Sequence, residues 1–314
     1  MHARRCPEAE SKPSTPDAMT KHIAHLQIDA HQHYWDPARG DYGWLTPELS
    51  APLYRSFGPA DLAPLRSRCG VARTVVVQAA PTVDETWYLL DLARHDDSIA
   101  GVVGWVPLDD PLAPELIDEL AREPKLRAVR PMLQDLPDDD WIAKADTSRA
   151  IEALIAHDLA FDALIFTRHA SALETFLARH RALRVVIDHG AKPPIKDAGE
   201  GGAGSPAFAA WSQAITRLAR FPQVYCKVSG LATEAAPGWS DATLRPWVEH
   251  LLASFGAQRL MWGSDWPVLN LNGDYERWHE SAERLLAHLG ERERAAVFGG
   301  NAAAFYGLRT DPAG

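Results

Sequence analysis

Short apolar runs recur along the chain, and polar residues stand where these runs end. A short run whose side chains are apolar on both faces is typical of a buried strand in a parallel sheet, because helices cover one face of the sheet and the core fills the other. The sequence therefore predicts eight buried strands. They span residues 25–33, 74–79, 101–107, 127–133, 160–166, 184–189, 223–229 and 259–264.

Segments with helical periodicity separate most of these runs, and two more follow the last run. They cover residues 85–94, 113–122, 148–157, 171–180, 208–219, 241–255, 275–289 and 291–305. Eight strands that alternate with helices favour a closed (β/α)8 TIM barrel, an α/β fold, over an open doubly wound sheet. We expect one barrel domain over residues 22–309, a disordered N-terminal extension over 1–21 and a C-terminal tail over 310–314.

The polar residues at the strand ends are the candidates for chemistry, because a barrel of this kind carries its active site at the carboxyl ends of its strands. His31 and His33 alternate along the first run and so project from the same face. His189 ends the sixth run and Asp265 follows the eighth. Three imidazoles and a carboxylate on one cavity suit a divalent metal ion or the polarisation of a carbonyl group.

Further residues near the strand ends are candidates for substrate binding. Arg130 is expected either to hold a substrate group or to pair with a buried acid inside the barrel. Asp29 is expected either to orient an imidazole or to form hydrogen bonds at the edge of a strand. Gln78 and Lys192 are weaker candidates of the same kind. The aromatic rings near strand ends suit either a sugar face or the packing of the barrel rim, and they belong to Trp35, Trp44, Trp105 and Trp266.

The composition of the chain indicates which binding partners and which cellular compartment to expect. The 314 residues carry a formal net charge of −10, which argues against a nucleic-acid partner. The three cysteines are too few for a disulfide framework, so the cytoplasm is the expected compartment. Residues 1–21 show no apolar segment of a signal peptide or membrane anchor, and no membrane partner is expected. Nothing in the sequence predicts the oligomeric state.

Six ordered segments give the chain a resemblance to a known family. They resemble the amidohydrolase superfamily, and within it the TIM-barrel lactonases that include L-fuconolactonase, L-rhamnonolactonase and 2-pyrone-4,6-dicarboxylate lactonase. The segments are residues 28–37 (IDAHQHYWDP), 43–45 (GWL), 129–131 (VRP), 187–193 (IDHGAKP), 226–231 (CKVSGL) and 262–267 (WGSDWP).

This resemblance implies a hydrolase that opens a small lactone, such as a sugar-acid lactone, to its hydroxy acid. It makes Asp265 the base that activates water, and it makes His31, His33 and His189 the holders of the scissile carbonyl, directly or through one metal. Two-metal members carry a carboxylated lysine or a glutamate on the fourth strand, where this chain has Arg130. One zinc ion and a metal-free site therefore both stay open.

The resemblance also places His169 at the fifth strand end as a substrate contact, although the surrounding residues 166–169 (FTRH) depart from the family pattern. Two other functions remain open at this point. One is a decarboxylase or amide hydrolase of the same superfamily, and the other is a barrel that binds a ligand without catalysis.

Overall fold

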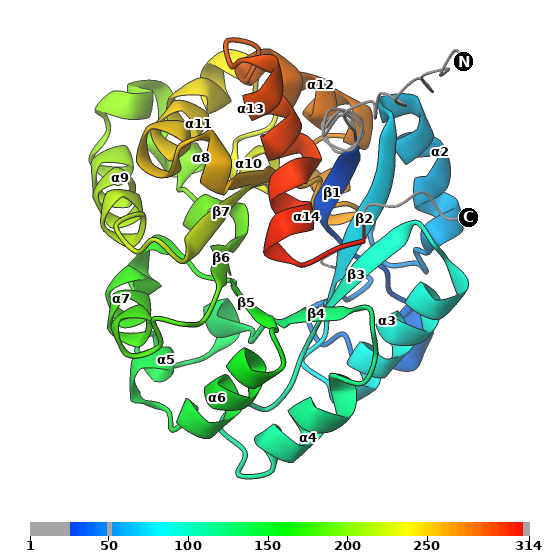
Figure 1. Ribbon diagram of the computed structural model, residues 1–314. Coiled ribbons are helices and arrows are strands. Elements are labelled where there is room, and N and C mark those ends of the chain that lie inside the picture. Colours follow the sequence, from blue (N-terminus) through cyan, green and yellow to red (C-terminus); the bar gives the residue numbers. More distant parts are fainter. Residues whose placement is uncertain (1–25, 49–51, 310–314) are drawn as a thin grey trace, which may run out of the picture.

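A closed ring of parallel strands forms the centre of the molecule (Figure 1). The computed structural model describes residues 26–48 and 52–309. Strand order follows chain order, and every neighbouring pair is parallel. The predicted (β/α)8 barrel is therefore confirmed. The strands are β1 (Gln27–Gln32), β2 (Val71–Val77), β3 (Ile99–Gly104), β4 (Leu126–Val129), β5 (Ala160–Ala163), β6 (Val185–Ile187), β7 (Val224–Val228) and β8 (Leu260–Trp262).

The ring closes between β1 and the segment that follows β8. The backbone N–H of Asp265 donates to the carbonyl of His31 at 2.8 Å, and that of His33 donates to the carbonyl of Trp266 at 2.7 Å. Gly263 permits this approach, because a Cβ atom there would lie 2.8 Å from the Cβ of His31. Closure thus brings the first and last polar clusters of the sequence side by side.

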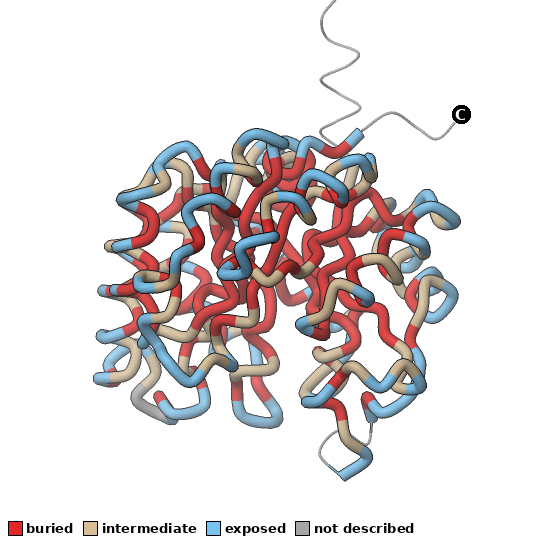
Figure 2. Tube along the Cα trace, turned by 90° about the horizontal axis from the view of Figure 1, so that it is seen from below, coloured by how far each residue is buried: buried red, intermediate tan, exposed pale blue. Residues whose placement is uncertain are grey.

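The alternating side chains of the strands build two apolar layers. Residues that point inward, such as Ile28, Val75 and Val186, form a core inside the ring. Their neighbours, such as Val76 and Val185, pack outward against the helices. Figure 2 shows the resulting buried centre beneath an exposed shell of helices and loops.

Helices surround the ring (Figure 1). Helix α2 was not predicted from the sequence, because Pro59 and Pro64 interrupt its pattern and only Leu62 is fully buried. The helices are α2 (Pro59–Cys69), α3 (Val83–His95), α4 (Ala113–Leu120), α5 (Trp141–Lys144), α6 (Ser148–Ala156), α7 (Ala170–Arg179), α8 (Ile195–Ala198), α9 (Pro206–Leu218), α10 (Leu231–Glu234), α11 (Asp241–Phe255), α12 (Tyr275–Leu285), α13 (Glu291–Ala295) and α14 (Asn301–Phe305).

The last predicted helix is wrong as a single element, because the chain turns between α13 and α14 at residues 296–300. This break lets α14 lie across one end of the ring (Figure 1). Phe305, Tyr306 and Leu308 pack there against the inner residues at the starts of the strands. The amino-terminal end of the barrel is therefore plugged, and the polar residues gather at the other end.

The predicted domain limits lie partly outside the described residues. The N-terminal extension over 1–21 and the tail over 310–314 both fall there, so the limits 22 and 309 stay predictions. Among the described residues, none of the helices has the length and apolar character that crossing a membrane requires.

Candidate active site

Four side chains converge at the carboxyl end of the barrel. His31 lies in β1 and His33 directly follows this strand, with their Nε2 atoms 3.2 Å apart. The Oδ1 atom of Asp265 lies 3.3 Å from Nε2 of His33 and 3.7 Å from Nε2 of His31. Nε2 of His189 lies 3.7 Å from the same oxygen. The structure thus brings together the four residues predicted to form the centre of the site.

Asp29 joins the end of β1 to the segment that follows β8, and these two segments carry His31, His33 and Asp265. Its Oδ1 accepts hydrogen bonds from the backbone N–H of His31 at 3.1 Å and of Ser264 at 2.8 Å. Its Oδ2 accepts from the Tyr275 hydroxyl at 3.1 Å. Of the two roles expected for Asp29, the structure shows the bonding of a strand edge, because these partners are two backbone groups and a phenol.

A left-handed turn carries His189 into the site. Residues 189–192 all have positive φ, with values of 53°, 58°, 60° and 47°. L-residues adopt this conformation at a cost, usually one at a time. Surrounding contacts hold the turn in place: the Trp211 indole donates to the carbonyl of Gly190 at 2.7 Å, and Nδ1 of His189 lies 2.8 Å from the Ser229 hydroxyl.

Gly230 makes room for the ring of His189. A Cβ atom at position 230 would lie 2.7 Å from Cγ of that ring, and the φ of Gly230 is +66°. Glycine is the residue that meets both demands at low cost. Ser229 thus lies within hydrogen-bond distance of the imidazole of His189, and Gly230 leaves space for that ring.

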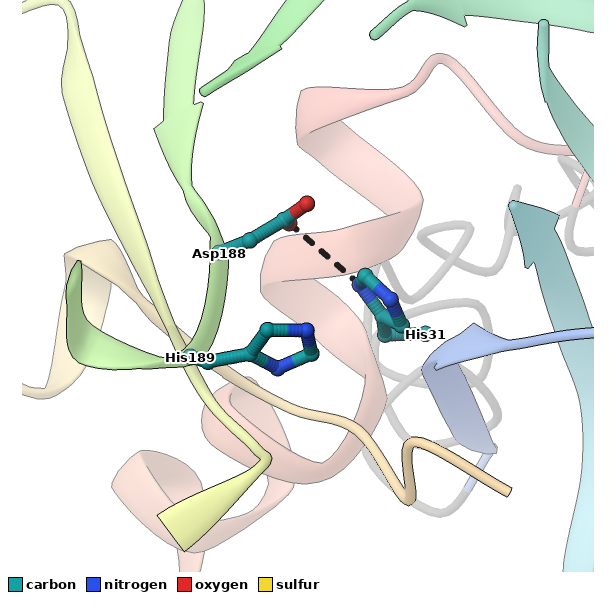
Figure 3. Close-up of side chains that lie close together, drawn as sticks. All are labelled: His31, Asp188 and His189. Atoms are coloured by element: carbon teal, nitrogen blue, oxygen red, sulfur yellow. Dashed lines mark ion pairs between the residues drawn. The ribbon is translucent and has the colours of Figure 1, made fainter. Parts of the chain in front are cut away.

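A buried ionic network stands behind His31. Nζ of Lys227 lies 3.0 Å from Nδ1 of His31, 2.9 Å from Asp188 and 2.6 Å from Asp162. Oδ1 of Asp188 lies 3.3 Å from the same Nδ1 (Figure 3). The Tyr306 hydroxyl, at the plugged end, donates to Asp162. A column of polar groups therefore crosses the barrel from the plug to the site.

Sequence reasoning gave Lys227, Asp188 and Asp162 no role in the site, although Lys227 and Asp188 lie in two of the segments that carry the family resemblance. The signal that could have found Lys227 is a lysine inside an otherwise apolar strand, because lysine is almost never fully buried without a partner. Asp188 and Asp162 are likewise fully buried.

Burial and charge set the ionisation of the central residues. Burial raises the pKa of Asp265, but the imidazoles of His189, His33 and His31 outweigh it and hold this pKa below its usual range. Burial lowers the pKa of His189 to about 4. Burial, together with the nearby charge of Lys227, also lowers the pKa of His31. At neutral pH the site thus combines a carboxylate with at least two neutral imidazoles.

Three of the four residues, His33, His189 and Asp265, border a cavity of about 260 Å³. Lys192 and Arg130 also line it. Arg130 nevertheless forms an ion pair with Asp188 at 3.2 Å and donates to the carbonyl of Gln78. Both expectations for Arg130 therefore have a counterpart in the structure: it pairs with a buried acid and it faces the cavity.

Trp44 also borders this cavity, whereas four other predicted contacts lie away from it. Gln78 donates to the carbonyl of Arg130, and His169 accepts from the backbone N–H of Phe166 while its Nε2 lies 3.0 Å from Asp139. Trp35 and Trp266 are buried and pack against Phe57. None of these four residues borders this cavity, and each has contacts within the protein.

The donor set fits a single metal ion. Ligand atoms around a tetrahedral zinc ion lie about 3.3 Å apart, because each bond is about 2.0–2.1 Å long. His31, His33 and Asp265 present their donor atoms at separations of 3.2 to 3.7 Å. If Nδ1–H of His31 donates to Asp188, the lone pair of its Nε2 faces the site, as in many zinc centres.

Comparisons with known proteins agree with this geometry. A family model described as Amidohydrolase matches residues 28–308. A curated L-fucono-1,5-lactonase from Burkholderia ambifaria is 50% identical over 285 residues, which cover 90% of this chain and 95% of that protein. Another, from Burkholderia multivorans, is 38% identical and covers 90% and 96%, respectively.

A solved structure is also similar to this protein in its fold. The crystal structure of an amidohydrolase from Burkholderia multivorans with bound zinc matches with a TM-score of 0.84 at 37% identity, covering 90% of this chain and 100% of that one. The similarity thus spans the barrel from its first strand to its plug. On the family match and these relatives, the chain belongs to the amidohydrolase family, as the six sequence segments predicted.

Proposed function

We propose that the enzyme hydrolyses L-fucono-1,5-lactone, or a sugar-acid lactone closely similar to it, to the open hydroxy acid. The predicted activity, opening of a sugar-acid lactone, is confirmed by the two curated lactonases. The observation that carries the choice of substrate is 50% identity across 90% of the chain. The cavity of about 260 Å³ also suits a single sugar ring, since larger drug-sized ligands occupy about 300–1,000 Å³.

Asp265 is the proposed general base. Its carboxylate is ionised at neutral pH and lies within the cavity. It takes a proton from water as the water oxygen bonds to the lactone carbonyl carbon. The bond from that carbon to the ring oxygen then breaks, and Asp265 returns the proton to the ring oxygen. The products are a hydroxyl group and a carboxylic acid, which releases its proton at neutral pH.

The imidazoles are proposed to stabilise the negative charge that develops on the carbonyl oxygen. A neutral imidazole offers either an N–H donor or a lone pair on Nε2, and the partner of Nδ1 decides which. Ser229 faces Nδ1 of His189, whereas Lys227 and Asp188 face Nδ1 of His31. The protein thus fixes both rings before substrate arrives.

We propose that His31, His33, His189 and Asp265 hold one zinc ion. The nitrogen-rich donor set suits zinc, and the zinc-bound relative supports this choice. A cation there would polarise the lactone carbonyl as a Lewis acid. Arg130, at the fourth strand end, adds positive charge where a second metal would need a carboxylate, which favours a single ion.

Lys192 is proposed to bind the substrate and its charged product. Its ammonium group lies 5.4 Å from the centre of the Phe166 ring, at the rim of the cavity. Among the described residues, no carboxylate forms an ion pair with Lys192. It is therefore available to the hydroxyl groups of the lactone and to the carboxylate that hydrolysis creates. Gln78, His169, Trp35 and Trp266 are proposed to support the loops around the site. The cytoplasm stays the predicted compartment.

A panel of lactones tests the substrate. The purified enzyme is mixed with L-fucono-1,5-lactone, other sugar-acid lactones and 2-pyrone-4,6-dicarboxylate, and proton release is followed with a pH indicator. We expect the highest kcat/KM with L-fucono-1,5-lactone. A higher value with the pyrone, or carbon dioxide release from an aromatic acid without lactone opening, would contradict the proposal.

A further inference from the structure

A second, larger cavity lies beside the catalytic one. Its volume is about 510 Å³, and it is bordered by the loops that follow β1, β2, β3 and β4. Three partly exposed tryptophans stand on its wall: Trp44 from the first loop, Trp105 from the third and Trp141 at the start of α5. The cavity therefore opens on the same end of the barrel as the site.

The two cavities share part of their walls. Trp44, Met132 and Asp135 border both. The Trp44 indole donates to the carbonyl of Ala79 at 2.7 Å, which fixes this ring at the boundary. A ligand held beside Asp265 can therefore extend across Trp44 and Met132 into the larger space.

The lining of the second cavity favours a sugar ring. Tryptophan offers a flat apolar face for the C–H groups of a sugar and an N–H for a hydroxyl. Within the described part of the chain, the indole N–H groups of Trp105 and Trp141 have no hydrogen-bond partner, and no aromatic ring stacks on either. Asp109 and Asp135 add exposed carboxylates that can accept hydrogen bonds from hydroxyl groups.

The charge of the lining narrows the choice further. The residues around the cavity include Asp41, Asp109 and Asp135 but no lysine or arginine. Arg39 forms an ion pair with Asp41 at 2.9 Å, but Asp109 and Asp135 form no ion pair among the described residues, so a carboxylated or phosphorylated ring would meet two uncompensated acidic groups. The occupant that fits is an uncharged, polyhydroxylated ring.

We propose that this cavity binds a second, neutral sugar ring attached to the lactone, so that the enzyme also opens sugar-acid lactones glycosylated on a ring hydroxyl. This inference rests on the proposed function. The lactone ring lies against Asp265 while the attached sugar stacks among Trp44, Trp105 and Trp141. Water attacks the same carbonyl carbon, and the glycosidic bond stays intact.

The test compares L-fucono-1,5-lactone with its three mono-glucosylated isomers, substituted on O2, O3 or O4. We expect at least one isomer to be hydrolysed with a kcat/KM no lower than that of the parent lactone. Trp105 borders only the second cavity. Trp105→Ala should therefore lower kcat/KM for that isomer about tenfold, as expected when one aromatic stacking contact is lost, and leave the parent within about twofold.

Two further variants separate binding from folding. Trp105→Tyr keeps an aromatic face and should restore most of the activity on the isomer. Trp141→Ala removes another ring that borders only this cavity and should reproduce the selective loss, with circular dichroism reporting the fold of each variant. A glucuronyl isomer should be a poor substrate, because the lining is acidic.

The outcomes keep the two proposals apart. Hydrolysis of the parent lactone with three inert isomers, or equal losses on parent and isomer in both alanine variants, overturns the second subsite and leaves the lactonase proposal intact. Failure to open the parent lactone overturns the proposed substrate, and with it this inference.

Discussion

At the scale of single residues, two buried charged side chains meet at the imidazole of His31. Lys227 and Asp188 both lie against Nδ1 of His31, and each favours a different proton position on that ring. A lysine contact requires an unprotonated Nδ1, whereas the carboxylate accepts its proton. Nη1 of Arg130 forms an ion pair with the other oxygen of Asp188, Oδ2, at 3.2 Å.

Glu85 is a further buried carboxylate, and its ionisation predicts how stability depends on pH. It accepts hydrogen bonds from the backbone N–H groups of Ala79 and Ala80, beneath the loop that reaches the cavity. Burial raises its pKa to about 8, although these bonds oppose the rise. The folded protein therefore holds a proton that the unfolded chain releases above its ordinary pKa of about 4.3.

The sign of the effect follows from this difference. Glu85 contributes stability that is fully present below about pH 4.3 and is lost as the pH rises through about 8, because the folded state binds more protons. Glu85→Gln should flatten the fall in the free energy of unfolding over this range, measured by urea unfolding. Glu249→Gln, an exposed change on α11, is the control and should keep the wild-type slope. If Glu85→Gln shows the same dependence of the unfolding free energy on pH as wild type and Glu249→Gln, Glu85 does not cause the fall in stability.

At the scale of elements, the left-handed turn over residues 189–192 joins the imidazole of His189, which lies 3.7 Å from Asp265, to Lys192, which borders the cavity. Its conformation costs about 1–2 kcal/mol per residue for L-amino acids, so it depends on the contacts around it. Trp211 of α9 supplies one of these contacts through its bond to Gly190.

Trp211→Phe tests this dependence. It removes the N–H and leaves a buried carbonyl without its donor, which costs about 1–3 kcal/mol. We expect kcat/KM on the lactone to fall several-fold, because His189 and Lys192 move together. Trp247→Phe is the matched control, since Trp247 is equally buried and stacks on Trp211 but does not bond the turn. Equal activities for the two variants, with equal losses of stability, would show that the bond does not position the turn.

Strand ends were predictable from the sequence because burial on both faces leaves a local, apolar signature, and this located His31, His33, His189 and Asp265. The helix α2 was not predictable, because its prolines hide a helical pattern. Neither the break before α14 nor its packing into the barrel follows from periodicity, since both depend on contacts with strands far away in the chain.

The same limit applies within the site. Partners such as Asp188 for Arg130, or Asp139 for His169, depend on which loops the closed barrel brings together. A sequence pattern places a residue at the rim but does not say whether its side chain faces the cavity or another loop. Trp35 and Trp105 illustrate this, because one is buried at β1 and the other borders the second cavity.

At the scale of the whole molecule, one end of the barrel is closed by a helix and the other end carries the candidate active site. The plug formed by α14 seals the amino-terminal end, and Tyr306 connects it to Asp162 in the polar column. The opposite end carries two adjoining cavities, one beside Asp265 and one lined by tryptophans. We expect the first to select the lactone and the second to select what is attached to it.

The most direct test of the account is the rate of proton release from L-fucono-1,5-lactone by wild-type enzyme and by Asp265→Asn, measured at the same enzyme concentration and with folding checked by circular dichroism. Asparagine keeps the size of the side chain but cannot accept the proton from water. We expect kcat to fall by about 10²- to 10⁴-fold, the usual contribution of a general base. A folded variant that keeps the wild-type kcat would contradict it.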